Sequence, residues 1–200
     1  MQSLVFATNN HNKFVEVERI LGTRYRILSP RDIEFDQHVE EPFESLEENA
    51  REKAVVIKRV SGLDCFAEDT GLFVQALKGA PGVKTARYAG DHASDQDNIE
   101  KLLRELEGVD DRGAIFKTVV CLLSNHKEYI FEGSCEGNIA RQKQGSAGFG
   151  YDPVFQPCGS PETFAEMGLE KKNYFSHRKK AIEKLVSHLS KQQATDLKSP

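Results

Sequence analysis

Short apolar runs of strand length alternate with segments of helical period along this chain, and this alternation restricts the fold more than any other feature. Residues 4–7 form an apolar run that ends in polar residues, which is typical of a buried strand entering a loop. Residues 14–21 then repeat apolar side chains with helical period, and Gly22 stands where a helix often ends. Because strands and helices interleave without a strict repeat, we predict an α/β fold with a mixed sheet.

Further elements follow from the same patterns. Residues 24–28 are predicted as a strand and residues 32–44 as an acidic loop or edge segment. The predicted helices begin near Leu46, Ser94 and Ser176 and end near Gly62, Gly108 and Lys191. Residues 114–123 and 128–135 are predicted as a hairpin that turns around Asn125.

Composition limits the classes of protein to which this chain can belong. With 200 residues and 38% apolar content, we expect one domain over residues 1–191 and a frayed polar tail at 192–200. No apolar run approaches the ~20 residues of a membrane span, and the first residues lack signal-peptide features, so we expect a cytoplasmic protein outside any membrane. The net charge of -4 gives no general attraction for a phosphate polymer, so no nucleic-acid partner is predicted.

The first candidate site is the polar segment Thr8, Asn9, Asn10, His11, Asn12 and Lys13 between a predicted strand and helix. Its hydroxyl and amide groups, the free N–H groups of the helix start and the Lys13 charge could cradle phosphate. An ordinary helix cap is the simpler alternative. The chain contains no G-x-x-x-x-G-K-[ST] motif, so phosphate binding here would not use a P-loop.

The second candidate is the acidic pair Glu68 and Asp69, which the pattern predicts as a turn interrupting a strand. Adjacent carboxylates between apolar residues cannot both reach solvent if the strand continues, and a buried carboxylate needs a cation. A carboxylate beside Mg²⁺ can orient or deprotonate water. Glu40 or Glu41 could complete such a site, and Lys53 could neutralise phosphate. A solvated acidic turn remains the alternative.

The third candidate region lies nearer the carboxyl end. Glycines on both sides of Phe149 allow a planar ligand to approach, and Asp152 can accept hydrogen bonds from a base edge. Lys172, His177 and Arg178 could donate hydrogen bonds to the keto oxygens of a base. A glycine-rich turn before a strand would explain the first of these patterns equally well.

Taken together and in order, these motifs resemble the inosine triphosphate pyrophosphatase family, and most of all its bacterial branch. That family removes deaminated purine nucleotides from the nucleotide pool. The matching segments are ATNNHNK at 7–13, ENAREKA at 48–54, AEDTGL at 67–72, GAPGVKTARYAG at 79–90, GFGYDPVF at 148–155 and SHRKKA at 176–181.

The resemblance implies a two-lobed fold around a twisted mixed sheet with flanking helices, a cleft between the lobes, and a homodimer. It also implies hydrolysis of ITP, dITP or XTP to the monophosphate and pyrophosphate with Mg²⁺. Residues 8–13 and Lys53 would hold the triphosphate, and Asp69 would be the general base. Glu68 and a glutamate at 40 or 41 would support the metal. The substrate contacts would include Thr70, Phe149, Gly150, Tyr151, Asp152, Lys172, His177 and Arg178.

Two other functions fit the same residues. A related pyrophosphatase for pyrimidine or modified nucleotides would keep the phosphate and metal residues but change the base pocket. A nucleotide-binding protein without catalysis would have little need for a buried carboxylate beside the phosphates. For a purine substrate, selectivity would come from the 6-keto oxygen, since the 6-amino group of adenine would face another donor.

Overall fold

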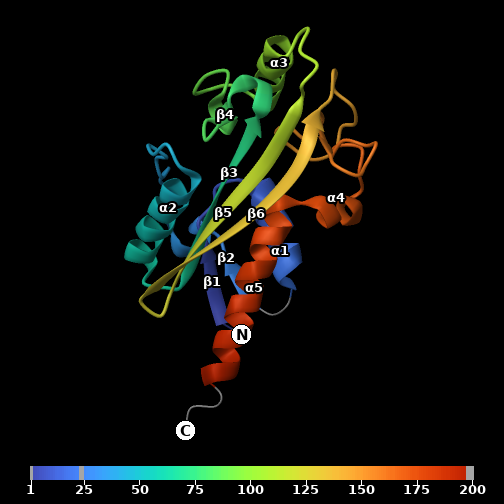
Figure 1. Cartoon of the computed structure of the whole chain (residues 1–200). Coiled ribbons are helices and arrows are strands. Elements are labelled where there is room, and N and C mark those ends of the chain that lie inside the picture. Colours follow the sequence, from blue (N-terminus) through green and yellow to red (C-terminus); the bar gives the residue numbers. More distant parts are fainter. Residues whose placement is uncertain (1, 23–24, 197–200) are drawn as a thin grey trace. The chain divides into compact units, whose positions relative to one another are not determined.

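The computed structural model of the chain describes residues 2–22 and 25–196 (Figure 1). Contacts within the chain divide it into two compact units. Unit 1 consists of Met1–Asp69, Thr118–Gly133 and Arg178–Pro200, and unit 2 consists of Thr70–Lys117 and Ser134–His177. Each unit has hydrophobic core clusters of its own.

Within the described residues, seven strands form one sheet in the order β2-β1-β3-β5-β6-β7, with β4 beside β3. The strands are β1 (Gln2–Phe6), β2 (Tyr25–Leu28), β3 (Cys65–Val74), β4 (Pro81–Gly82), β5 (Gly113–Ser124), β6 (Lys127–Ile139) and β7 (Phe155–Pro157). β1 is parallel to β2 and β3, whereas the pairs β3–β4 and β6–β7 are antiparallel. The predicted mixed-sheet α/β fold is therefore confirmed.

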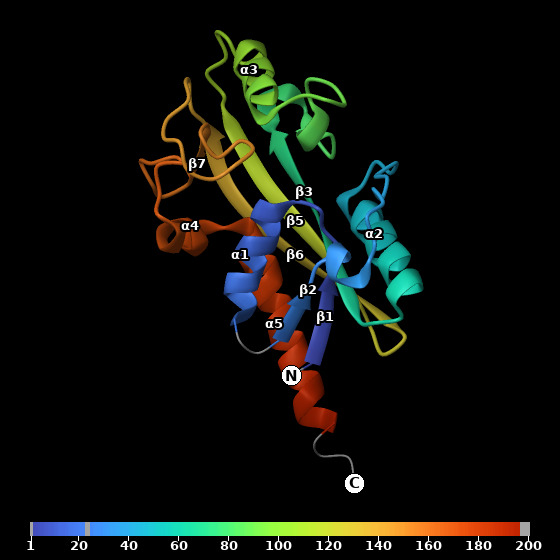
Figure 2. The ribbon, with the colours of Figure 1, turned by 180° about the vertical axis from the view of Figure 1, so that it is seen from behind.

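In unit 1, helices cover both faces of the strands. The helices are α1 (His11–Leu21), α2 (Leu46–Ser61) and α5 (His177–Asp196), and a 3-10 helix, η2, spans Pro30–Ile33. Leu4 and Phe6 of β1 pack in a core cluster with α1 and α5, whereas Val5 and Ala7 pack in a cluster with α2. Figures 1 and 2 both show α2 on the side of β1 away from α1 and α5. Side chains that alternate along these strands therefore meet different helices.

In unit 2, the core is rich in aromatic rings. Its helices are α3 (Asp95–Glu105) and α4 (Leu169–Phe175), and its 3-10 helices are η3 (Gln75–Leu77) and η4 (Thr85–Arg87). The Phe155 ring lies 4.6 Å from the ring of Phe116 and 5.1 Å from that of Phe164, centroid to centroid. These rings join apolar side chains of α3 in one cluster. The loop that follows Ile139 is thus anchored by buried aromatic residues.

Several predicted elements are confirmed at their ends. α2 ends at Ser61, and its C-cap is Gly62, whose φ of 69° is a left-handed conformation that glycine adopts readily. Ser94 and Asp97 form a capping box at the start of α3. β5 and β6 form the predicted hairpin, and Asn125 at its turn has a φ of 50°.

Other predictions need correction. The predicted acidic turn at residues 68–71 is wrong, because β3 runs unbroken from Cys65 to Val74. α5 begins at His177 rather than Ser176 and extends to Asp196, beyond the predicted end at Lys191. The rest of the predicted tail, 197–200, and the first residue of the strand predicted at 24–28 lie outside the described residues. Helix α4 and the 3-10 helix η2 were not predicted.

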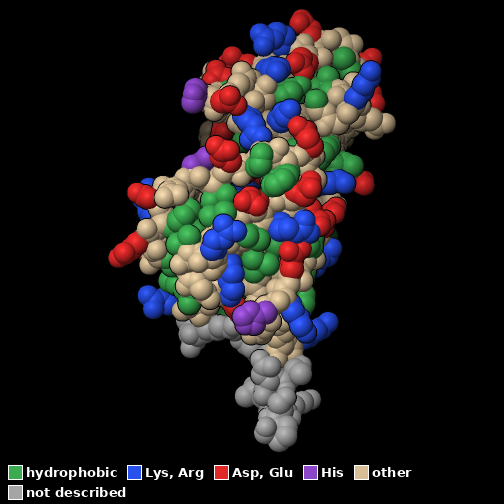
Figure 3. All heavy atoms as spheres, turned by 90° about the vertical axis from the view of Figure 1, so that its left-hand side faces the viewer, with side chains coloured by type: hydrophobic (Ala, Val, Ile, Leu, Met, Phe, Trp, Pro, Cys, Tyr) green, Lys and Arg blue, Asp and Glu red, His purple; other side chains and the backbone are tan. Residues whose placement is uncertain are grey.

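Acidic and basic side chains are interspersed over the face of the molecule drawn in Figure 3. That face offers no uniformly basic area, in agreement with the net charge of -4. Among the described residues, no helix combines the length and apolar character needed to cross a membrane.

Phe66 gives a test of the unit 1 core. Its side chain is fully buried, and its ring stacks on that of Phe6 with centroids 4.6 Å apart. We expect Phe66→Ala to lower the free energy of unfolding by about 3–5 kcal/mol, because the substitution leaves a cavity. The half-exposed Val60 is the control, and Val60→Ala should change that energy by less than about 0.5 kcal/mol in urea denaturation. Equal losses for the two variants would contradict this account of the core.

Candidate active site

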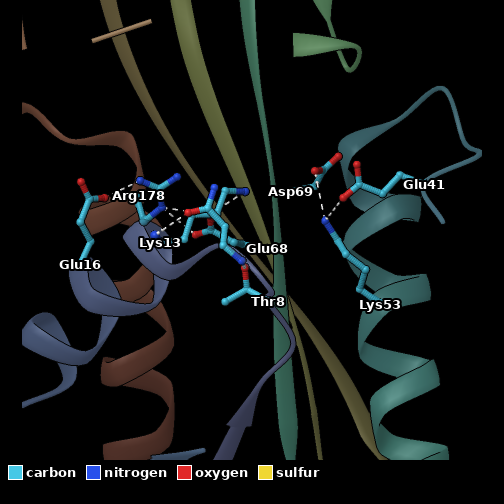
Figure 4. A network of polar contacts seen from close by, with 9 residues as sticks. Thr8, Lys13, Glu16, Glu41, Lys53, Glu68, Asp69 and Arg178 are labelled. Carbon is cyan, nitrogen blue, oxygen red and sulfur yellow. Dashed lines mark hydrogen bonds and ion pairs between the residues drawn. The ribbon is translucent and has the colours of Figure 1, made fainter. Parts of the chain in front are cut away.

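Strand β3 places two neighbouring carboxylates on opposite faces of the sheet. Phe66 packs in the cluster with α1 and α5, and Ala67 packs in the cluster with α2. Because side chains alternate along a strand, Glu68 follows Phe66 toward α1 and α5, and Asp69 follows Ala67 toward α2. Figure 4 shows this divergence, with cations on each side. Glu68 is 2% exposed and Asp69 5%, so both carboxylates are withdrawn from solvent.

On the first face, two cations hold the Glu68 carboxylate. Nζ of Lys13 lies 3.2 Å from Glu68 Oε1, and Nε of Arg178 donates to both carboxylate oxygens at 2.9 Å. Arg178 is also paired with Glu16 through Nη1. Burial opposes ionisation of Glu68, but Arg178 and Lys13 outweigh it and hold the pKa of Glu68 below its usual 4.5. Glu68 is therefore ionised at neutral pH.

The local sequence explains how Lys13 reaches this position. Asn10 is the N-cap of α1, and its side-chain oxygen accepts a hydrogen bond from the Lys13 backbone N–H at 3.1 Å. Thr8 supports the same loop, because its Oγ1 accepts a hydrogen bond from Asn10 N at 3.2 Å. Residues 8–13 therefore contain the predicted helix cap, and this cap does not exclude the predicted phosphate cradle in the same segment.

On the second face, Asp69 belongs to a separate group of polar side chains. Nζ of Lys53 lies 3.2 Å from Asp69 Oδ1 and 2.5 Å from Glu41 Oε1. Burial and the nearby Glu41 raise the pKa of Asp69, against the opposing effect of Lys53 and Lys13. Burial alone would lower the pKa of Lys53, but Asp69 and Glu41 raise it above 10.5. Lys53 therefore stays charged and bridges the two carboxylates.

This second group separates the two acidic-loop candidates that the sequence left open. Glu41 is half-buried and paired with Lys53, whereas Glu40 is exposed. A cavity of about 70 Å³ is lined by Glu41, Lys53 and the loop residues 7–9. Another cavity, of about 410 Å³, lies between loop residues 8–11, α1 and residues 29–32. Thr8 and Asn9 line both cavities, and Asn10 and His11 line the larger one. Asn12 is also exposed.

The oxygen donors at Asp69 and Glu41 suit a hard divalent cation. Mg²⁺ is usually held by one or two carboxylates together with substrate phosphates and water. Here two carboxylates converge on one positive group, the Lys53 ammonium. Among the described residues, no group of three or more His, Cys, Asp or Glu side chains forms a protein-only metal site. Asp69 and Glu41 could therefore supply two oxygen ligands to a divalent cation.

Unit 2 brings together three of the predicted substrate residues, Phe149, Asp152 and Lys172. Nζ of Lys172 donates to Asp152 Oδ2 at 2.8 Å and lies 5.2 Å from the centre of the Phe149 ring. Both charged side chains are buried. Asp152 Oδ2 also accepts a hydrogen bond from Phe149 N at 3.0 Å, which closes the turn. A side chain at Gly148 would clash, because its Cβ would lie 2.0 Å from Asp152 Oδ2.

The remaining predicted residues occupy different environments in unit 2. The Tyr151 side chain is buried, and its hydroxyl donates to Thr85 O at 3.0 Å. His177 stacks on Phe116 with ring centroids 4.6 Å apart. Gly150 N donates to Asp95 Oδ2 at 2.7 Å, and Thr70 is half-buried on β3. Arg178, which the sequence grouped with His177, instead pairs with Glu68 in unit 1.

Sequence reasoning gave no site role to two residues of these groups, although one of them, Asn49, lies in the matched segment at 48–54. Glu16 lies three residues after Lys13 on α1 and pairs with Arg178. Asn49 lies four residues before Lys53 on α2, and its Nδ2 is 3.4 Å from Asp69 Oδ2. Helical spacing of three or four residues could have flagged both, since such residues share a face of a helix.

This chain is similar to known proteins over most of its length. The model of the Ham1 family matches residues 4–188. The chain belongs to the Ham1 family. It is 48% identical over 188 residues to the dITP/XTP pyrophosphatase of Christiangramia forsetii, covering 94% of this chain and 99% of that protein. It is 46% identical over 190 residues to the dITP/XTP pyrophosphatase of Porphyromonas gingivalis, with coverage of 94% and 98%.

Solved structures of the Ham1 family share the fold. The Ham1 proteins of Coxiella burnetii and Staphylococcus aureus both match with a TM-score of 0.87 and 36% identity. Each match covers 96% of this chain and 100% of the solved chain. The family expected from the motifs is confirmed by the family match over residues 4–188 and by these relatives, which are named as pyrophosphatases.

The buried Glu68 gives a test by pH. Its folded-state pKa is below the usual 4.5, so its stabilising contribution is complete above that pH and is lost as pH falls through the folded pKa. Glu68→Gln should remove this titration and flatten the fall in unfolding free energy below pH 4.5. At pH 7 the variant should be less stable by about 3 kcal/mol, because Lys13 and Arg178 lose a charged partner.

Urea denaturation at a series of pH values measures both effects. The control is Glu107→Gln, which changes an exposed glutamate. It should leave the unfolding free energy within about 0.5 kcal/mol of the unmodified protein at every pH. If Glu68→Gln behaved like this control, the ion pairs of Glu68 would have no net effect on stability.

Proposed function

We propose that this chain hydrolyses non-standard purine nucleoside triphosphates (dITP, XTP and ITP) to the nucleoside monophosphate and pyrophosphate, with Mg²⁺. Membership of the Ham1 family over residues 4–188 is the observation that carries this proposal. The names of the relatives, dITP/XTP pyrophosphatase, supply the reaction. The buried Asp69, bridged through Lys53 to Glu41, supplies a group suited to it.

In the proposed reaction, water attacks the α-phosphorus and the bond from that phosphorus to the bridging oxygen breaks. Asp69 accepts a proton from the water, and its raised pKa makes it a stronger base than an ordinary aspartate. Lys13 and Lys53 neutralise the charge of the departing pyrophosphate. Bound Mg²⁺, held by Asp69 and Glu41, would polarise the phosphate oxygens. The predicted support of the metal by Glu68 needs correction, because Glu68 lies on the opposite face of β3 and would act by holding Lys13 and Arg178.

Thr8 to Lys13 would bind the triphosphate through the loop and the first turn of α1. This assignment is supported by the open space beside the loop and by the cap that presents Lys13. The exposed Asn9, His11 and Asn12 add polar groups to the same segment. Thr70, next to Asp69 in the chain, would contact the substrate.

Recognition of the base would involve Phe149 to Asp152 with Lys172, His177 and Arg178. The close approach of Lys172 to both Asp152 and the Phe149 ring supports this, since it combines a ring face with polar groups. A donor facing the 6-position would donate a hydrogen bond to a keto oxygen and disfavour the amino group of adenine. Arg178 engages Glu68 and Glu16, so its contribution to the base would add to those contacts.

The proposal extends to the state of the protein in the cell. We propose a homodimeric, cytoplasmic enzyme in which residues 1–191 act as one pyrophosphatase domain that takes no nucleic-acid partner. The net charge of -4 supports the last of these points.

A panel of ITP, XTP, dITP, dUTP, dTTP and ATP, with detection of pyrophosphate, tests the substrate class. We expect the three non-standard purine nucleotides to be hydrolysed fastest, and only with added Mg²⁺. Faster turnover of dUTP or dTTP would favour a pyrimidine pyrophosphatase. Binding of ITP without release of pyrophosphate would favour a non-catalytic binding protein.

Asp69→Asn tests the proposed base. The variant should lose about 100-fold or more in kcat, because an amide cannot accept the proton from water. Nucleotide affinity should stay within about threefold, since the phosphate and base contacts remain. Steady-state kinetics with ITP and a binding measurement give the two values.

Asp64→Asn is the matched control for this experiment. Asp64 is also a unit 1 aspartate in an ion pair, 2.9 Å from Nζ of Lys58, but it is not one of the proposed site residues. Its kcat should stay within about twofold of the unmodified enzyme. Near-normal turnover by Asp69→Asn would remove Asp69 from its role as base.

A further inference from the structure

The completely buried Asn49 lies at the centre of the polar group around Asp69. It stands on α2 one turn before Lys53, so both side chains leave the same face of the helix. Asn49 is 0% exposed. A polar side chain withdrawn from water to this extent must satisfy its hydrogen bonds inside the protein, which makes its contacts informative.

The Asn49 amide makes three hydrogen bonds. Its Oδ1 accepts from Phe43 N at 3.0 Å, and its Nδ2 donates to Phe43 O at 3.1 Å. The same Nδ2 donates to Asp69 Oδ2 at 3.4 Å. Since the amide nitrogen has two hydrogens, both of its donors are engaged. One side chain thus joins a loop backbone to a strand carboxylate.

These contacts fix the two proposed metal ligands from different sides. Phe43 is two residues after Glu41, so clamping its peptide groups sets the course of the acidic loop. Lys53 then holds the Glu41 carboxylate itself. At Asp69, Lys53 binds Oδ1 while Asn49 binds Oδ2, so the plane of the carboxylate is defined at both oxygens.

We propose that Asn49 is a positioning residue that holds the Glu41 loop and the Asp69 carboxylate in register for the reaction. This inference rests on the proposed function, because it concerns the same reaction centre. An amide suits the task because it supplies donors to Asp69 without adding a charge beside two carboxylates and a lysine. Groups that orient metal ligands act through geometry, and removing one typically lowers activity or metal affinity about 10–100-fold.

Unit 2 contains a natural control for this role. Asn98 of α3 is 2% exposed and forms the same kind of clamp on a loop backbone. Its Oδ1 accepts from Ala89 N at 2.7 Å, and its Nδ2 donates to Ala86 O at 3.1 Å. Substitution of Asn98 therefore removes a buried backbone clamp without removing a contact with Asp69, and this makes it a control for substitution of Asn49.

The experiment compares Asn49→Ala with Asn98→Ala in the full-length protein. Both variants should lose similar unfolding free energy in urea, because each leaves buried backbone groups without partners. With ITP, only Asn49→Ala should lower kcat, by about 10–100-fold, and raise the Mg²⁺ concentration for half-maximal rate about tenfold. Its KM for ITP at saturating Mg²⁺ should stay within about threefold, because the substrate contacts are unchanged.

Hydrogen exchange supplies a readout that does not depend on turnover. Amide exchange in residues 41–45 should speed up at least about tenfold in Asn49→Ala and stay unchanged in Asn98→Ala, where exchange in residues 86–89 should rise instead. Asn49→Leu serves as a second variant if Asn49→Ala does not fold. Leucine keeps nearly the branched shape of the asparagine side chain but makes none of its hydrogen bonds, so kcat should still fall.

The outcomes separate the two claims. If the unmodified protein releases no pyrophosphate from ITP or XTP, the proposed function fails, whatever the exchange data show. If it does so and Asn49→Ala keeps kcat and Mg²⁺ dependence within about twofold, the positioning role is overturned. A kcat loss equal to that of Asn98→Ala would also overturn it, because the effect would then be general destabilisation.

Discussion

The burial of two adjacent carboxylates on one strand is the constraint on which the rest of this site depends. A strand directs Glu68 and Asp69 to opposite faces, and neither reaches bulk water. An uncompensated buried charge is very unfavourable, so each carboxylate requires its own cations from the elements packed on its face. Lys13 and Arg178 meet Glu68, and Lys53 meets Asp69. The helices that pack on the sheet to form the core therefore also supply the cations that the buried carboxylates need.

The two faces have different electrostatic balance, which suits them to different tasks. Glu68 has two cationic partners and a lowered pKa, so it is a fixed negative charge that orders Lys13 and Arg178. Asp69 shares Lys53 with Glu41 and has a raised pKa. A carboxylate that is less fully neutralised keeps a greater affinity for a proton or a further cation. Because of this difference, Glu68 has a structural role and Asp69 has the proposed chemical role.

Unit 2 follows the same rule with a smaller group. The buried Lys172 and Asp152 pair with each other, and Asp152 also closes the turn at Phe149. Gly148 leaves room for that carboxylate, because any side chain there would overlap it. A turn that looks merely glycine-rich in the sequence is thus shaped by one buried ion pair.

Local patterns in the sequence were sufficient for much of the fold. The stripe from Leu46 to Ile57, the Ser94–Asp97 capping box and the turn at Asn125 specify their elements through interactions between near neighbours. The family could also be predicted from the sequence, because each motif is a short continuous segment and the motifs follow one another in the family's order. The turn predicted at the acidic pair 68–69 was wrong. Local propensity contains no information about the cations from distant segments that allow these carboxylates to stay in a buried strand.

The sequence by itself determined most helices and strands, the family and most of the polar residues of the site. Only the tertiary structure decided how those residues are grouped: Arg178 with Glu68, Glu41 rather than Glu40 beside Lys53, and Asn49 between Phe43 and Asp69. The physical reason is distance along the chain. Arg178 lies 110 residues from Glu68, and only packing of α5 and β3 in one core cluster brings such partners into contact.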